Sequence, residues 1–245
     1  MTRQAQILEL LAERGFHSVG ELADILRVAP STIRRDLEQL ADRQLVRRTH
    51  GGAVPIESNG VASAGATLHR AEKEAIGRAM ADRILDGQTV LLDSGSTTLE
   101  VARHLHSSRL TIVTNDLRIG SVIAEKQSAN LVFIGGELLP NDFSMWGPTS
   151  VEQLRHLRVN VAILGCDTVL DDGLYSVSSY EIELKRVMLS IASDAFFVAD
   201  SSKFGRDALF RIAELEPFQA GITDAHLDPL RASTFPVPLI RATSG

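Results

Sequence analysis

The chain contains almost no cysteine and no long apolar run. Its one cysteine, Cys166, has no second cysteine with which to form an internal disulfide. No stretch of about 18 consecutive apolar residues is present, so no membrane span is expected. The first residues, Met-Thr-Arg-Gln-Ala-Gln, lack the apolar core of a signal peptide. These absences predict a cytoplasmic protein. Its 245 residues, 44% of them hydrophobic, suffice for one large domain or for a small and a medium one.

Lysine is absent from the first 50 residues, although eight arginines lie there. Seven acidic residues accompany the arginines, so this segment carries a charge of +1 while the whole chain carries −6. A nucleic-acid interface needs local rather than global positive charge. The uneven distribution is therefore consistent with two regions that have different roles.

The first 50 residues follow a helix-turn-helix pattern. Residues 3–14 have apolar side chains at helical spacing, and Gly15 ends that helix. Residues 18–21 read Ser-Val-Gly-Glu, the spacing of a capping box, and predict a second helix that continues to about Arg27. Pro30 is suited to the first position of a third helix. Two helices joined by so short a connection predict helix-turn-helix geometry.

The third helix has an apolar back and a charged front. Ile33, Leu37 and Leu40 fall at i, i+4 and i+7, so they share one face, which we expect to be buried. An arginine on the opposite face can donate two hydrogen bonds to guanine in the major groove of DNA. A solvated charged surface with an Arg–Asp pair is the alternative. The residues expected to project away from the apolar face are Thr32, Arg34, Arg35 and Asp36.

Residues 45–54 predict a hairpin, because two short β-prone segments flank Gly51-Gly52. Beside the third helix such a hairpin would be a wing, and its basic side chains could reach phosphate groups or the minor groove. A plain surface hairpin is the alternative, but this one is wholly positive and follows an arginine-rich helix. The residues predicted to contact DNA are Ser31, Thr32, Arg34, Arg35, Arg47, Arg48 and His50.

These segments resemble the N-terminal winged helix-turn-helix of DeoR-type bacterial transcriptional regulators. The resemblance rests on T-I-R-R-D-L at residues 32–37 and H-G-G-A at residues 50–53. Members often carry serine just before the recognition helix, where this chain has Ala29. An alanine N-cap has no side chain with which to accept an amide hydrogen bond, and forgoes about 1 kcal/mol of helix stability.

Beyond this module the composition changes twice. Residues 55–66 are small, polar and aperiodic, which predicts a flexible linker between a domain of residues 1–54 and one of residues 67–245. From Thr67 on, apolar strands alternate with helices, which predicts an α/β domain with a mostly parallel, buried sheet. Ligands bind such sheets beyond the carboxyl ends of the strands. The expected strands are residues 89–92, 110–113, 131–134, 159–164, 196–199, 220–223 and 238–240.

One strand end predicts an anion site. Asp93 follows an expected strand, and residues 94–98 read Ser-Gly-Ser-Thr-Thr before a helix. Free backbone amides at a helix N-terminus, with several hydroxyls nearby, form a cradle for an anion. No Gly-Lys-Ser/Thr follows, so this is not a Walker A loop, and a structural turn is the alternative. Two other expected strands end near polar residues that could bind the same ligand. The side-chain amide of Asn115 could form a hydrogen bond with a ligand hydroxyl. The ammonium of Lys203 could pair with a phosphate group, and a solvated surface lysine is the alternative. Glu181 and Lys185, at i and i+4, are most simply a surface pair.

The larger segment resembles the C-terminal sensor domain of the same family. The resemblance rests on D-S-G-S-T-T at 93–98, T-N at 114–115, D-S-S-K-F-G at 200–205 and T-D at 223–224. It implies a fold similar to ribose-5-phosphate isomerase and CoA-transferase-like proteins, and a phosphorylated sugar or related metabolite as effector. Members usually have aspartate where this chain has Asn160, which puts a charge-dependent role there in doubt. The implied effector-binding residues are Asp93, Ser94, Gly95, Ser96, Thr97, Thr98, Asn115, Glu181 and Lys203.

The patterns predict a DNA-binding transcriptional regulator, and the resemblance implies a repressor of carbohydrate-metabolism genes whose operator affinity responds to a sugar phosphate. Because one winged helix contacts one half-site, a homodimer or homotetramer is expected. No cofactor is predicted. His104 and His106 point apart on a helix, so no metal site is predicted either. An enzyme of the isomerase or transferase type with an attached DNA module is the main alternative, and a winged helix that binds only proteins is another.

Overall fold

The computed structural model describes residues 2–14, 16–43, 45–49, 51–55, 69–126, 129–139 and 142–243. The chain divides into two compact units, residues 1–70 and 71–245. Gly15, His50 and linker residues 56–66 lie outside the described residues. Among the described helices, none has both the length and the apolar character that a membrane span requires.

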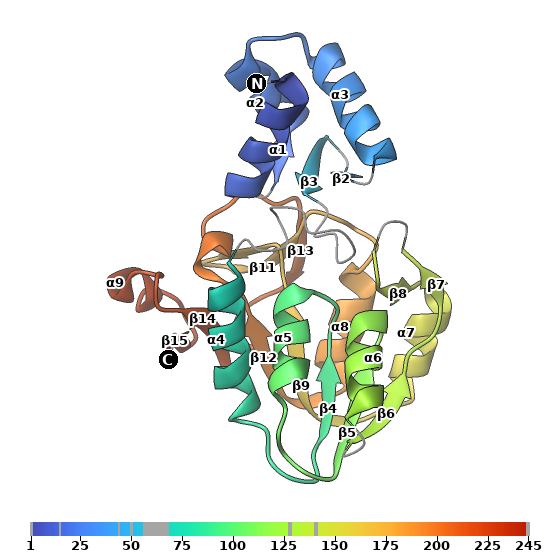
Figure 1. Cartoon of the computed structure of the whole chain (residues 1–245). Coiled ribbons are helices and arrows are strands. Elements are labelled where there is room, and N and C mark those ends of the chain that lie inside the picture. The colour runs from blue at the N-terminus through green and yellow to red at the C-terminus, as the bar shows by residue number, and fades with distance from the viewer. Residues whose placement is uncertain are drawn as a thin grey trace. The chain divides into compact units, whose positions relative to one another are not determined.

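The described residues of the first unit form three helices and a small antiparallel sheet with strand order β1-β3-β2 (Figure 1). This confirms the three predicted helices and the hairpin, whereas the short strand β1 was not expected. The helices are α1 (Arg3–Arg14), α2 (Val19–Leu26) and α3 (Pro30–Asp42). The strands are β1 (His17–Ser18), β2 (Val46–Thr49) and β3 (Gly52–Pro55).

Local sequence signals account for these elements. The capping box of α2 is present, because the Ser18 hydroxyl accepts a hydrogen bond from the Glu21 amide at 3.1 Å and the Glu21 carboxylate accepts one from the Ser18 amide at 2.7 Å. Ala29 is the N-cap of α3 and provides no side-chain cap. In the hairpin, Gly51 has φ +94°, and a Cβ on Gly52 would lie 2.3 Å from the His17 carbonyl oxygen. Both positions therefore require glycine.

The second unit is built on a seven-stranded parallel sheet with strand order β15-β14-β12-β9-β4-β5-β6. All seven predicted strands are confirmed. The strands are β4 (Thr89–Leu92), β5 (Leu110–Thr114), β6 (Ala129–Phe133), β9 (Val159–Gly165), β12 (Ala192–Val198), β14 (Ala220–Asp224) and β15 (Leu239–Ala242).

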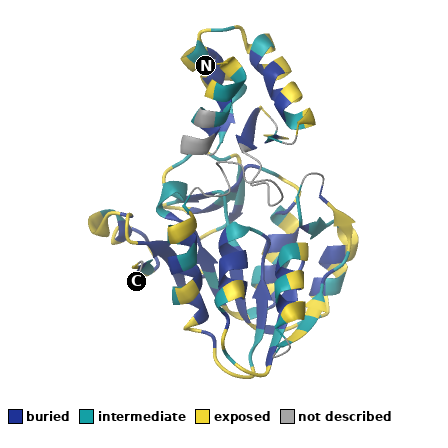
Figure 2. Ribbon diagram, viewed as in Figure 1, coloured by how far each residue is buried: buried dark blue, intermediate teal, exposed yellow. Residues whose placement is uncertain are grey.

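Helices cover both faces of this sheet (Figure 1). One apolar core joins α4 (Arg70–Ala81), α5 (Ser96–His104) and α6 (Leu117–Glu125) to the sheet. The core on the other face joins α7 (Pro148–Arg155) and α8 (Ile182–Ser190) to it. Figure 2 shows the central strands as mostly buried and the outer sides of the helices as exposed. The parallel sheet is thus enclosed, as its apolar strands predict.

Several short elements were not expected from the sequence. A second small sheet, with order β10-β11-β13, packs with α8, and a two-stranded ribbon is formed by β7 and β8. The strands are β7 (Glu137–Leu138), β8 (Met145–Trp146), β10 (Thr168–Leu170), β11 (Gly173–Ser176) and β13 (Phe210–Ala213). The helical additions are the 3₁₀ turn η1 (Ser201–Lys203) and α9 (Pro229–Ala232).

The order of the strands places a switch point between β4 and β9. From β4 the chain proceeds outward through β5 to β6, and it then returns to β9 on the other side of β4. From β9 it proceeds outward in the opposite direction, through β12 and β14 to β15. Ligands of open α/β sheets bind at such points, beyond the carboxyl ends of the strands. The end of β4 carries Asp93, and the end of β9 is Gly165.

The opposite edge of the sheet has a structural role for Asn160. Its side-chain oxygen accepts a hydrogen bond from the Thr89 amide at 2.8 Å, where β9 and β4 begin. An amide oxygen suffices for this bond, so a carboxylate charge is not required there.

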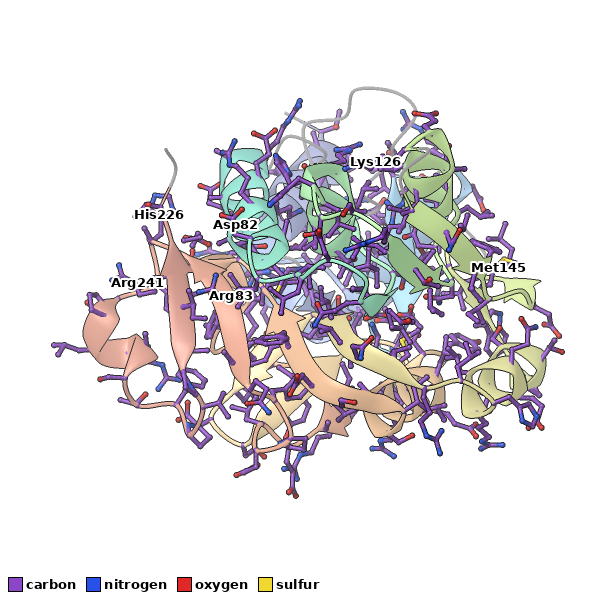
Figure 3. All side chains as sticks on the ribbon, turned by 90° about the horizontal axis from the view of Figure 1, so that it is seen from below. Asp82, Arg83, Lys126, Met145, His226 and Arg241 are labelled. Atoms are coloured by element: carbon purple, nitrogen blue, oxygen red, sulfur yellow. The ribbon has the colours of Figure 1, made fainter. Side chains whose placement is uncertain are left out.

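The C-terminal end of α5 is capped by a lysine from the end of α6. The Lys126 ammonium (labelled in Figure 3) donates to the carbonyl oxygens of Arg103 and Leu105, both at 2.7 Å. A cation at that end of a helix opposes the negative end of its dipole.

Candidate DNA-binding surface and effector site

Helix α3 presents its arginines to solvent. Arg34 and Arg35 are exposed, whereas Ile33, Leu37 and Leu40 are at most 1% exposed and pack in the core of the first unit. Ser31 is exposed and Thr32 is half-buried on the same helix. The apolar back and the polar front predicted for this helix are therefore present.

Asp36 is an exception, because it does not project outward with the arginines. It is 6% exposed, and its carboxylate pairs with the Arg3 guanidinium of α1, which donates from Nε and, at 3.1 Å, from Nη2. The prediction that Asp36 faces solvent is wrong, because its position borders Ile33 and Leu37 on the side that packs against α1. A buried carboxylate requires a partner, and Arg3 provides it. The ion pair ties α3 to α1 and sets the direction in which Arg34 and Arg35 point.

The hairpin adds further basic side chains. Arg48 lies in β2 and is 3.4 Å from the Glu38 carboxylate of α3, with both side chains largely exposed. Such an exposed pair contributes little free energy and leaves Arg48 available to a phosphate group. Arg47 lies in β2 opposite Val54. His50 falls outside the described residues.

In the second unit, the turn from β4 to α5 leaves the N-terminus of a helix without a side-chain cap. Gly95, the N-cap of α5, has φ +136° and offers no side-chain cap. The amides of residues 96–98 belong to the first turn of the helix and have no acceptor within it. They point out of the positive end of the helix dipole, which favours a negatively charged ligand.

The hydroxyl groups of this turn divide into two sets. Ser94 donates to the Glu181 carboxylate at 2.9 Å, and Thr98 donates to the Gly95 carbonyl at 2.9 Å. These two side chains hold the turn in place. Ser96 is half-buried and Thr97 is buried in the same turn. The cradle thus consists of backbone amides with Ser96 and Thr97.

Asp116, which the sequence analysis did not single out, supports the cradle from α6. Its carboxylate is buried and accepts a hydrogen bond from the Gly95 amide at 3.3 Å. It also caps α6 through the Arg118 and Ile119 amides and pairs with the Arg118 guanidinium at 2.6 Å. An aspartate directly before a helical pattern is an N-cap signal, so the capping role was readable from the sequence. Its bond to Gly95 was not.

Asn115 already uses its amide donor. Its Nδ2 donates to the Met145 carbonyl at 2.9 Å, and the Met145 amide donates to the Asn115 carbonyl at 2.8 Å. These bonds fasten β8 beside the end of β5. The side-chain oxygen of Asn115 is buried and has no hydrogen-bond partner among the described residues. This buried acceptor remains for a ligand.

Glu181 and Lys185 are buried, so the expectation of a surface pair is wrong. Lys185 is 4% exposed, and its ammonium pairs with the Asp93 carboxylate and donates to the Gly165 carbonyl at 3.3 Å. The Gly165 amide in turn donates to Asp93 at 3.0 Å. Position 185 points inward because α8 packs this side against the ends of β4 and β9. Lys185 is thus a site residue that sequence reasoning missed.

The network around Asp93 alters the acidity of its members. Burial raises the pKa of Asp93 from 3.8 to about 6, with Lys185 opposing the rise and Glu181 adding to it. Burial alone would lower the pKa of Lys185, but the charges of Asp93 and Glu181 raise it above its ordinary value. At neutral pH the ion pair is therefore formed.

Two further side chains, Cys166 and Lys203, belong to the same edge of the sheet. Burial raises the pKa of the Cys166 thiol to about 12, and the charges of Lys203 and Lys185 act against that rise. Lys203 is half-buried in η1, which Asp200 caps through the Ser202 amide at 3.1 Å. Cys166 follows β9 directly, and η1 follows the carboxyl end of the neighbouring parallel strand β12, so Lys203 lies on the same edge of the sheet as Lys185.

A helix-turn-helix module with outward arginines, in one chain with an α/β unit that carries an anion cradle, defines a DNA-binding transcriptional regulator with a sensor domain. Residues 3–59 match the DeoR-like helix-turn-helix domain, and residues 68–225 match the DeoR C terminal sensor domain. The chain belongs to the DeoR family.

Curated relatives agree over most of the chain. The transcriptional repressor AccR of Agrobacterium fabrum is 36% identical over 229 residues, which cover 91% of this chain and 89% of AccR. The glycerol-3-phosphate regulon repressor of Escherichia coli is 34% identical, with 91% of this chain and 90% of the relative covered. The HTH-type transcriptional regulator YulB of Bacillus subtilis is 31% identical, with 99% and 95% covered.

Likeness to solved structures is slight. A D-ribose-5-phosphate isomerase overlaps 54% of this chain and 52% of its own, with a TM-score of 0.41 and 16% identity. A probable sor operon regulator from Shigella flexneri overlaps 65% of this chain and 88% of its own, with a TM-score of 0.43 and 12% identity. Scores this low carry no inference about activity.

The raised pKa of Asp93 predicts a dependence of stability on pH. A carboxyl group whose pKa is higher in the folded protein binds its proton more tightly when folded. The stability that it contributes is full below its unfolded pKa of 3.8 and is lost as the pH rises through about 6. We therefore expect the free energy of unfolding of the wild type, relative to Asp93→Asn, to fall between about pH 4 and pH 6. Urea unfolding followed by the fluorescence of Trp146, the one tryptophan, measures this difference. A difference that rises with pH would contradict the assignment.

Proposed function

We propose that this protein represses genes of carbohydrate metabolism by binding double-stranded operator DNA, and that a phosphorylated sugar or related metabolite releases it. The observation that carries this proposal is the uncapped N-terminus of α5 at the switch point of the sheet, in a chain that also presents Arg34 and Arg35 on α3. A relative described as the glycerol-3-phosphate regulon repressor, 34% identical, supports an effector of this chemistry.

DNA recognition is assigned to α3 and the hairpin. Arginine side chains on α3 read guanine edges, while those of β2 and the hairpin contact phosphate groups. We take residues 1–54 as the DNA-binding domain, 55–66 as the linker and 67–245 as the effector-sensing and oligomerisation domain. A homodimer or homotetramer in the cytoplasm brings two recognition helices to two half-sites. The proposed DNA-binding residues are Ser31, Thr32, Arg34, Arg35, Arg47, Arg48 and His50.

Effector binding is assigned to the edge of the sheet around α5. The amides of residues 96–98 bind the phosphate group, with the Ser96 and Thr97 hydroxyls beside them. Ser94, Gly95 and Thr98 shape the turn. The remaining groups proposed to contact the effector are Asp93, Asn115, Glu181 and Lys203. In this role the domain senses a metabolite and does not convert it, so isomerase turnover of a sugar phosphate by the purified protein would contradict the proposal.

Release of DNA requires the effector to favour a form of the protein with weaker operator affinity. Such coupling between two sites typically amounts to about 1–3 kcal/mol, or roughly 5- to 150-fold in affinity. By reciprocity, operator DNA must weaken effector binding by the same factor. The coupling is thus measurable from either ligand.

Replacing Arg34 or Arg35 with alanine tests DNA recognition. If either arginine reads a base, the substitution should weaken specific operator binding by about 1–3 kcal/mol, because the bidentate bonds to guanine are lost. Glu38→Gln on the same helix is the matched control, and it should leave affinity unchanged or raise it, since it removes a negative charge beside Arg48. Fluorescence anisotropy with labelled upstream DNA gives the affinities. Unchanged affinity in both arginine variants would remove α3 as the reading helix.

Ser96→Asp tests the cradle. A carboxylate in the first turn of α5 would repel a phosphate group, so we expect operator binding without effector to persist and release by effector to fail. The matched control is Ser121→Asp on the exposed side of α6. Both variants are titrated with the sugar phosphate that releases the wild type most effectively from its upstream DNA. Normal release of Ser96→Asp would show that the phosphate binds elsewhere.

A further inference from the structure

Beside the α5 cradle, three buried ionisable side chains, Asp93, Glu181 and Lys185, lie close enough for their charges to interact. Asp93 pairs with Lys185, and Glu181 lies one helical turn before Lys185 with its charge acting on both. Ser94 links this group to the cradle, because its hydroxyl donates to Glu181 at 2.9 Å and its neighbour Gly95 is the N-cap of α5. If the phosphate of a ligand binds at the N-terminus of α5, the rest of the ligand therefore lies next to Asp93, Glu181 and Lys185.

This Asp93–Lys185–Glu181 group carries one more negative than positive charge. All three residues are at most 8% exposed, so solvent and salt screen that charge little. The adjacent carboxylate, Asp116, is already neutralised by Arg118 at 2.6 Å. The phosphate is bound by amides and a helix dipole, with Lys203 as the one cation proposed to contact the effector, so a second anionic group placed beside Asp93 and Glu181 would meet net negative charge.

The carboxyl edge of the sheet also contains two buried side-chain oxygens that accept no hydrogen bond from the described residues. Asp93 Oδ1 and Asn115 Oδ1 are buried and have no hydrogen-bond partner among the described residues. They belong to the ends of β4 and β5, which are neighbours in the sheet and flank the cradle. A buried acceptor left without a donor costs free energy. Hydroxyl groups on a ligand would supply the missing donors.

We propose that Asp93, Glu181 and Lys185 form a second subsite, which binds hydroxyl groups of the effector and rejects ligands that carry a second anionic group. Lys185 holds the Asp93 carboxylate at the end of β4, Ser94 holds the Glu181 carboxylate, and both carboxylates accept from the hydroxyls. The effector class is thereby narrowed to polyhydroxylated phosphate monoesters, with bisphosphates and phosphorylated carboxylic acids excluded. The inference rests on the proposed function, since it takes the phosphate to be at α5.

Calorimetric titration of the full-length protein with matched ligands tests the subsite. Three pairs differ by a second anionic group: fructose 6-phosphate and fructose 1,6-bisphosphate, glucose 6-phosphate and 6-phosphogluconate, glycerol 3-phosphate and 3-phosphoglycerate. A fourth pair, glycerol 3-phosphate and propyl phosphate, differs by hydroxyl groups. In every pair that binds, the hydroxylated ester with a single anionic group should bind at least about ten-fold more tightly, because like charges and unpaired acceptors penalise the other member.

Glu181→Gln separates recognition from a structural role. The neutral amide keeps the size of the side chain but removes the excess charge, so the preference within the first three pairs should shrink several-fold. Loss of structure alone would weaken both members of a pair equally and leave their ratio unchanged. Glu183→Gln, exposed on the same helix and paired with Arg155, is the matched control and should not alter the ratio. Circular dichroism and thermal unfolding check that the variants fold.

The outcomes separate the two proposals. Tighter binding of a bisphosphate or a phosphorylated acid by the wild type, or a ratio that Glu181→Gln leaves unchanged, would overturn the second subsite while leaving the phosphate cradle standing. If neither inorganic phosphate nor any phosphate ester of the panel binds, the proposed function fails as well.

Discussion

The buried ion pair between Asp93 and Lys185 ties helix α8 to two neighbouring strands of the parallel sheet, β4 and β9. It connects the end of β4 to α8, and through Gly165 it connects both to the end of β9. Charges this deeply buried are tolerated only when they are paired and hydrogen-bonded. Ser94 and Gly95 extend the network to Glu181 and Asp116. The first turn of α5 is therefore held in a binding geometry before any ligand arrives, so little free energy has to be spent on ordering it.

The DNA-binding unit uses a similar device on a smaller scale. The pairing of Arg3 with Asp36 joins α1 to α3, while the apolar stripe of α3 occupies the core beneath. Arg34 and Arg35 are thereby held on the outer face of a helix whose rotation is already set. In each unit a buried carboxylate is paired with a cation, Asp36 with Arg3 and Asp93 with Lys185. Neither pair uses the arginines of α3 or the first amides of α5, which are the groups proposed to bind DNA and the phosphate. Family membership and the fold both support one assignment of roles, in which the first unit binds DNA and the second unit senses the effector.

Periodicity and caps were sufficient to predict α1, α2, α3 and the seven parallel strands, because each has its own apolar pattern. The charged side chains were predicted less well. Asp36 and Lys185 were assigned to the surface, since their partners Arg3 and Asp93 lie 33 and 92 residues away in the sequence and no local pattern reveals them. Short strands such as β1 and β10 were missed because two or three residues cannot show alternation. The strand-end position of Asp93 and the residues of the following turn were predictable, but the bonds that occupy Ser94, Thr98 and Asn115 were not.

The central claim is that a phosphate group binds to the backbone amides at the N-terminus of α5. Amide proton and nitrogen chemical shifts of the full-length protein, labelled with ¹⁵N at serine and threonine, measure this directly during a titration with the releasing sugar phosphate. The account predicts that the largest changes fall on the amides of Ser96, Thr97 and Thr98, while Ser31 and Thr32 at the start of α3 change little. Saturable binding that leaves the three α5 amides unshifted would contradict it.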